Sequence, residues 1–129
     1  MTNREIVQNL NNLYAMQSRE EKNGAAKLSV RVGYAVRKNI DMLNRVYRPY
    51  SLSLEAIQGK YLTDRKYDDS GQMEFREGKE KEGYEIEVKE LLDVDNGDIS
   101  IHKVSLADLE SCSNLTMADQ DALYFMVEG

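Results

Sequence analysis

A chain of 129 residues, of which 41% are hydrophobic and 31% are charged, has the size and composition of a single soluble domain. No apolar run approaches the roughly 20 residues that cross a bilayer, and no apolar leader segment follows Met1. The single cysteine, Cys112, excludes an intramolecular disulfide, so we expect a cytoplasmic protein without a membrane partner.

The charges are distributed unevenly along the chain. Residues 25–48 hold six basic residues and one acidic residue, a net charge of +5, and the whole chain has a net charge of −6. The remainder therefore carries −11. Either the acidic part of the chain packs against this basic segment, or the segment is a surface for an anionic ligand or an acidic partner.

Helical spacing begins close to the N-terminus. Thr2 and Glu5 have the spacing of a capping box, and they precede apolar residues at helical intervals, which predicts a helix over residues 3–22. Gly24 suits a left-handed C-cap, and a second helix is expected to start near Ala25. Because the connection is short, the two helices should be antiparallel neighbours.

The longest periodic pattern covers residues 28–61 and predicts a helix that overhangs the first one. Pro49 lies inside it and lacks a backbone donor. The apolar stripe continues in phase past Pro49, which favours a kinked helix; a break with Ser51 or Ser53 as a new N-cap is the alternative. The stripe has steps of three or four residues: Leu28, Val32, Val36, Ile40, Leu43, Val46 or Tyr47, Tyr50, Leu54, Ile57 and Tyr61.

The middle of the chain has weaker patterns. Residues 64–71 are typical of a polar loop, residues 72–76 of a short strand and residues 78–83 of a charged turn. Residues 82–92 fit a helical template, which we prefer. The competing interpretation is a strand, because Tyr84, Ile86 and Val88 alternate.

Turn and cap signals organise the last third. Asn96-Gly97 is typical of a tight hairpin turn and predicts a strand over residues 98–104. Residues 105–109 should form a short helical turn. Thr116 and Asp119 have the N-cap to N3 spacing, which predicts a final helix over residues 117–127.

Together these elements predict an α+β fold. Residues 1–63 form an N-terminal helical hairpin with a long second helix, and residues 64–129 form a small antiparallel sheet with one or two helices. We expect the two parts to fold as one cooperative unit. Because the overhang of the long helix cannot be buried on the shorter one, a second copy of the chain is a natural cover, and we predict a homo-oligomer.

The run from Asp93 to Asp98 has the appearance of a calcium loop, but its spacing is wrong. With Asp93 as position 1, Gly97 and Asp98 occupy positions 5 and 6, where an acid or amide and then a glycine are needed. Position 12 is Val104 in place of a bidentate glutamate. A turn is therefore expected there.

Other catalytic and metal-binding patterns are missing from the sequence. His102 and Cys112 are too few for a structural zinc site, and their separation does not favour a catalytic pair. No Gly-rich nucleotide motif, P-loop or nucleophile elbow occurs. We therefore expect no enzymatic activity, no metal and no cofactor.

The basic part of the long helix is the best candidate for a binding site. Guanidinium groups bind phosphates bidentately, and a tyrosine can stack on a base. Because the chain is acidic overall, a small anionic ligand or an acidic partner is favoured over general nucleic-acid binding. The candidate residues are Arg31, Lys38 and Arg45, which recur every seven residues, together with Tyr34, Arg37 and Arg48.

Two segments are similar to a known family. Gly33-Tyr34-Ala35-Val36-Arg37-Lys38-Asn39-Ile40 resembles the small-Tyr-x-apolar-x-basic-Asn-apolar segment of a family of small phage and prophage proteins. Val104-Ser105-Leu106-Ala107-Asp108-Leu109, with the later Leu123-x-x-Met126-Val127, resembles the closing segment of that family. The similarity spans most of the chain from about Leu28, and the chain departs from it at Pro49 and in the loop from Asp93 to Asp98.

This family is a domain of unknown function in phages of Gram-positive bacteria, so the resemblance supplies no catalytic residues. It implies a viral origin and action in a bacterial cytoplasm. We hypothesise a counter-defence factor that inhibits a host protein or sequesters an anionic nucleotide signal. The alternative is a structural or assembly protein of the virion that acts through helix-mediated oligomerisation.

Overall fold

The computed structural model describes residues 1–23 and 28–128 and confirms the predicted α+β class. None of the helices in these residues combines the length and apolar composition that crossing a membrane requires. The elements, in chain order, are α1 (Asn3–Asn23), α2 (Val30–Tyr61), β1 (Leu62–Tyr67), β2 (Met73–Phe75), α3 (Lys81–Leu92), α4 (Leu106–Glu110), α5 (Met117–Leu123) and the 3-10 helix η1 (Tyr124–Met126).

The first helix begins as predicted. The backbone N–H of Thr2 donates to Glu5 Oε1 at 3.0 Å, and that of Glu5 donates to Thr2 Oγ1 at 3.2 Å, which is a capping box. The expected C-cap at Gly24 and the expected helix start near Ala25 lie outside the described residues. The second helix begins only at Val30, because Ser29 accepts a hydrogen bond from the Val32 N–H and caps it.

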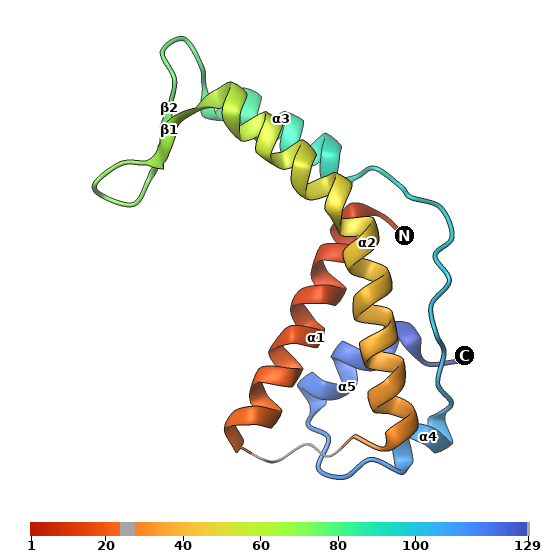
Figure 1. Ribbon diagram of the computed structural model, residues 1–129. Coiled ribbons are helices and arrows are strands. Elements are labelled where there is room, and N and C mark those ends of the chain that lie inside the picture. The colour runs from red at the N-terminus through yellow and green to blue at the C-terminus, as the bar shows by residue number, and fades with distance from the viewer. Residues whose placement is uncertain (24–27, 129) are drawn as a thin grey trace.

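The long helix α2 continues through Pro49, so the alternative of a broken helix is wrong. Figure 1 shows that its axis bends midway. A proline in a helix removes one hydrogen bond and tilts the two halves, which agrees with a kink. Tyr50, directly after the proline, is buried, so the apolar stripe remains in phase across it.

The hydrophobic core lies in the body of the molecule, between α1, the first half of α2, α5 and η1. Val104 joins this core through a parallel bridge to the C-terminal segment, in which its N–H donates to Met126 O at 2.8 Å. The helical turn predicted over residues 105–109 is confirmed as α4, and the predicted cap at Thr116 is confirmed for α5. The predicted helix over residues 117–127 ends earlier, at Leu123, and continues as η1. The buried core residues are Ile6, Leu10, Leu13, Met16, Val32, Ala35, Val36, Leu43, Val104, Ala122, Leu123 and Met126.

The second half of α2 forms an arm that projects from the body together with α3 and the β1–β2 hairpin (Figure 1). The buried Tyr84 of α3 meets Tyr61 and Phe75 edge-on, with ring centroids 5.9 Å apart in both pairs. The helix predicted over residues 82–92 is therefore confirmed, and the strand interpretation is wrong. Because α3 packs on the overhang of α2, the overhang alone no longer requires a second copy, and the homo-oligomer stays a prediction.

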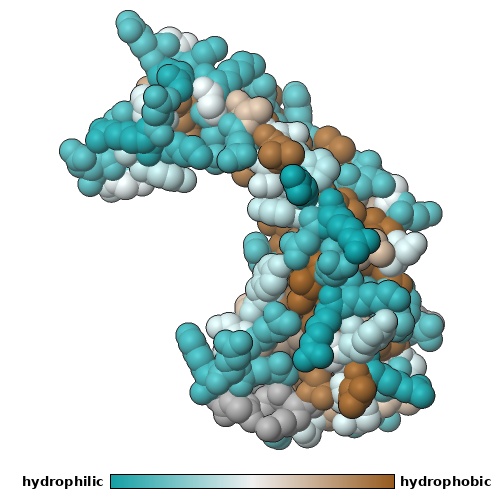
Figure 2. All heavy atoms as spheres, in the orientation of Figure 1, coloured by the Kyte–Doolittle hydropathy of each residue, from teal (hydrophilic) through white to brown (hydrophobic). Residues whose placement is uncertain are grey.

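The hairpin at the tip of the arm was only half predicted. The strand expected at residues 72–76 is present as β2, but residues 64–67, expected in a polar loop, belong to β1. Cross-strand polar pairs stabilise β1: Arg65 forms an ion pair with Glu74, and Thr63 Oγ1 donates to the same carboxylate at 2.8 Å. Figure 2 shows the arm curving to one side of the body, with a mostly hydrophilic tip.

The strand expected over residues 98–104 is wrong. Gly97 does have a positive φ of 74°, and its N–H donates to Asp95 Oδ1 at 2.9 Å, but residues 98–103 form no strand. The chain instead runs down the body as an extended segment to Val104 (Figure 1). The amide side chain of Asn39, on α2, binds both backbone groups of His102 and takes the place of a neighbouring strand.

Candidate functional site

All six predicted binding residues lie on α2 with exposed side chains, but they do not form one site. Arg31 and Arg45 are 14 positions apart, which corresponds to about 21 Å along a helix. Arg45 forms an ion pair with Asp41 on the next turn at 2.8 Å, and both side chains are exposed. Arg45 and Arg48 are therefore separate from the group formed by Arg31, Tyr34, Arg37 and Lys38.

Arg31 and Tyr34 of this group line a groove that we call the Tyr34 groove. It has a volume of about 420 Å³ and lies between the start of α2, the extended segment that ends at Val104, and α4. Its charged and aromatic lining consists of Arg31, Tyr34, His102, Lys103 and Asp108. The sequence prediction found the two α2 residues but missed the other three, which tertiary structure brings to the groove.

Asn39 explains why the segment reaches this position. Its side chain is 1% exposed, accepts a hydrogen bond from His102 N–H at 2.7 Å and donates one to His102 O at 3.0 Å. The backbone of the segment is thereby fixed against α2. The imidazole ring of His102 then lies edge-on to the Tyr34 ring at 5.5 Å, and Lys38 Nζ is 5.7 Å from the centre of the same ring.

The cations of the groove are only weakly neutralised. The closest approach of Arg31 to an acidic group is 3.9 Å, to Asp108 Oδ1, and its side chain is 85% exposed. The hydrogen bond from Ser105 N–H lowers the pKa of Asp108, partial burial opposes this effect, and Arg31 adds a smaller lowering. Lys103 Nζ donates to the carbonyl of Phe125 at 3.1 Å and keeps its positive charge uncompensated by a carboxylate there.

These contacts bear on the two interpretations of the basic segment. Arg37, Lys38 and Arg48 form no ion pair with any residue in the described parts of the chain. Within the described residues, the acidic part of the chain therefore does not cover the basic residues of positions 28–48, and most of their charge faces solvent. This arrangement favours a surface for an external anion.

The remaining polar candidates are structural. Cys112 Sγ accepts a hydrogen bond from Ser29 N–H at 3.3 Å, near the start of α2, and forms no hydrogen bond with His102. In the run from Asp93 to Asp98, which has the appearance of a calcium loop, the Asp93 carboxylate pairs with Arg4 at 2.9 Å and with Lys89 at 2.7 Å. Within residues 1–23 and 28–128, no three His, Cys, Asp or Glu side chains are grouped as metal ligands would be.

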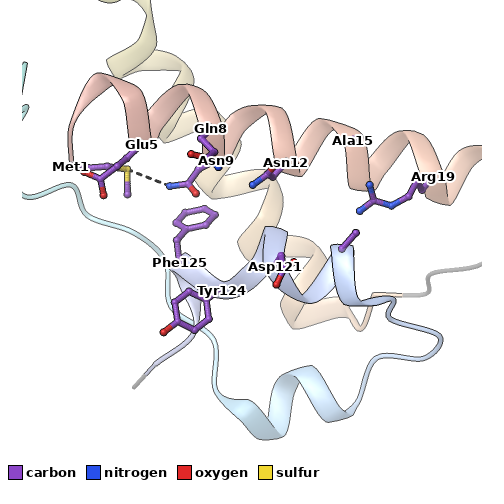
Figure 3. Close-up of a pocket in the computed structure, with 11 residues that line it drawn as sticks. Met1, Glu5, Gln8, Asn9, Asn12, Ala15, Arg19, Asp121, Tyr124 and Phe125 are labelled. Carbon is purple, nitrogen blue, oxygen red and sulfur yellow. Dashed lines mark hydrogen bonds between the residues drawn. The ribbon is translucent and has the colours of Figure 1, made fainter. Parts of the chain in front are cut away.

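A second groove, which we call the α1–α5 groove, was missed by the sequence prediction. It has a volume of about 710 Å³ and separates α1 from α5 and η1 (Figure 3). Its α1 wall carries amide side chains, and its opposite wall carries Asp121, Phe125 and Tyr124, which is 81% exposed. The amide-rich run Gln8-Asn9-Leu10-Asn11-Asn12, unusual inside a helix, was the available signal.

One end of the α1–α5 groove is fixed by an ion pair between α1 and α5. Arg19 Nη2 lies 2.7 Å from Asp119 Oδ1, and Asp119 is 1% exposed. Burial by itself raises the pKa of Asp119. Hydrogen bonds from Thr116 and Arg19 outweigh this effect, so the pKa is lowered below its ordinary value.

Comparisons of the chain with models of protein families, with curated proteins and with solved structures give no match. The resemblance to small phage proteins therefore stays a prediction that is based on the two sequence segments alone.

Proposed function

We propose that this protein is a non-enzymatic binding protein that captures an anionic, phosphate-containing ligand in the Tyr34 groove. The observation that supports this proposal best is the convergence of Arg31, Tyr34 and Lys103 on one open groove. These residues come from segments about 70 positions apart. Of the two cations, Arg31 approaches the carboxylate of Asp108 only to 3.9 Å, and Lys103 donates to a backbone carbonyl.

The chemistry of the groove suits such a ligand. The ion pair between Arg31 and Asp108 is as long as 3.9 Å, so the guanidinium group of Arg31 can exchange this carboxylate for a phosphate. A guanidinium group binds a phosphate bidentately, at about 2.7–2.9 Å. The exposed Tyr34 ring offers a stacking surface for a base. The groove volume of about 420 Å³ falls within the range of roughly 300–1,000 Å³ for small-molecule sites.

The phage resemblance suggests a biological setting for this activity. The protein would act in the cytoplasm of an infected bacterium and remove a nucleotide signal of host defence, or occupy an acidic face of a host protein. A structural or assembly role in the virion is the second candidate. The arm favours it by exposing the apolar side chains of Leu52 (55%) and Ile86 (53%), which a neighbouring subunit would cover.

A thermal-shift panel tests the proposed function. Purified protein is heated with cyclic dinucleotides, nucleoside triphosphates or inorganic pyrophosphate, and bound ligand raises Tm by mass action. We expect a rise for at least one anion, lost in Arg31→Glu and Lys103→Glu but kept in the control Arg45→Glu. An equal loss in the control, or no rise with any anion, would contradict the proposal.

Light scattering during size exclusion, with assays of purified virions, tests the assembly alternative.

A further inference from the structure

We propose that the α1–α5 groove binds an extended polypeptide segment that carries a basic side chain. This binding site is separate from the Tyr34 groove and has the opposite charge. The proposal combines the amide groups on one wall of the groove, its length, and its acidic and aromatic opposite wall.

The α1 wall presents carboxamides in a row. Gln8, Asn9 and Asn12 line the groove, and Figure 3 shows Asn9 and Asn12 on the side of α1 that faces α5 and η1. Asn9 and Asn12 are half-buried, yet within the described residues these three side chains form only one long hydrogen bond, from Asn9 to the Met1 sulfur at 3.7 Å. Each carboxamide has a donor and an acceptor, so it can pair with the N–H and C=O groups of a peptide backbone.

The dimensions fit an extended chain. Glu5 and Arg19, at the two ends of the α1 wall, are 14 positions apart, which is about 21 Å along the helix. At about 3.3 Å per residue, this length holds roughly six residues of extended peptide. Ala15 on α1 and Ala118 on α5 also line the groove, and their short side chains take up little of its space.

The charge of the groove selects the side chain of the peptide. Arg19 is neutralised by the buried Asp119, whereas Asp121 forms no ion pair within the described residues, and Glu5 adds a second carboxylate. Tyr124 and Phe125 add two aromatic rings to the same groove. An arginine or lysine would gain both an ion pair and a cation–π contact there, whereas a phosphate group would be repelled.

The experiment uses a random octapeptide display library and the full-length protein. Selection on the wild-type protein should enrich peptides with at least one arginine or lysine. One enriched peptide is then synthesised with a fluorescent label, and its Kd is measured by fluorescence anisotropy. We expect the Kd to rise at least about tenfold for Asn9→Ala/Asn12→Ala and for Tyr124→Ala.

Matched controls keep the test specific. Asn11→Ala removes an amide from another face of α1, where Asn11 faces Tyr14 and Asn44 in a different pocket, and it should leave the Kd unchanged. Asp121→Asn should reduce the preference for basic peptides. Circular dichroism checks that each variant is folded. Because Tyr124 is exposed, Tyr124→Ala should leave the fold intact, so it serves as the second variant. Failure to enrich any peptide, enrichment of acidic peptides, or equal binding by the variants would overturn the proposal.

Discussion

Replacement of Asn39 by leucine should destabilise the protein because this one amide attaches the segment before Val104 to α2. The side chain makes two hydrogen bonds to the backbone of His102, at 2.7 and 3.0 Å, and is 1% exposed. Leucine has a similar size, so the dominant cost is the loss of partners for His102 N–H and C=O. An unpaired buried group costs about 1–3 kcal/mol.

The expected magnitude follows from the position of His102. Because His102 is half-buried, water can partly replace the lost amide, and we expect the free energy of unfolding to fall by about 2–4 kcal/mol. Urea unfolding followed by circular dichroism measures this change. Hydrogen exchange at the His102 amide should accelerate in parallel, because the segment is no longer held against α2.

Asn44→Leu is a matched control on the same helix. Asn44 is exposed and donates to Tyr14 Oη at 2.8 Å, so its replacement should change the free energy of unfolding by less than about 0.5 kcal/mol. If Asn39→Leu were as stable as Asn44→Leu, the segment would be held by other contacts and our account of the groove would be wrong. Asn39→Leu should also weaken anion binding, although Asn39 does not line the Tyr34 groove.

Four further changes test the packing of the body and the arm. Arg19→Ala should lower the free energy of unfolding by about 3 kcal/mol, measured in urea, because it leaves the buried carboxylate of Asp119 without its cation. The pKa of Asp119 is lowered from 3.8, so its ionised form stabilises the fold above about pH 4 and this stabilisation is lost as the pH falls through the folded-state pKa. The stability difference between wild type and Asp119→Asn should therefore shrink in acid; a constant difference from pH 7 to about pH 2 would refute this. Gly83→Val should destabilise the arm by about 1–3 kcal/mol and expose α3 to hydrogen exchange, because a Cβ there lies 3.1 Å from the Tyr61 ring. Gly59→Ala, with open space around it in α2, should instead stabilise the protein by about 0.5–1 kcal/mol.

Local signals in the sequence account for the elements that were predicted correctly. The capping box at Thr2 and Glu5, the stripe of α2 and the cap at Thr116 each depend on residues within one or two helical turns. Such interactions can be recognised from spacing alone. The continuity of α2 through Pro49 is also visible locally, because the stripe keeps its phase.

The elements that were missed depend on distant partners. Arg65 and Thr63 form a strand because Glu74 lies across the hairpin, and polar pairs of this kind leave no apolar periodicity. The segment before Val104 alternates as a strand would, but its hydrogen-bonding partner is Asn39, more than 60 residues earlier. The same long-range contact places Lys103 in the groove that Tyr34 lines, which is why only the two α2 residues of the candidate site could be predicted.

The most direct test of the central claim is a titration of isotopically labelled protein with inorganic pyrophosphate, followed by two-dimensional amide NMR. We expect saturable shifts at Arg31, Tyr34 and Lys103, with a Kd below about 1 mM. The amides of Arg45 and Arg48, about 21 Å or more along α2 from Arg31, should remain unchanged. Shifts centred on Arg45 and Arg48, or no saturable shift at the Tyr34 groove, would contradict the assignment of this groove as an anion-binding site.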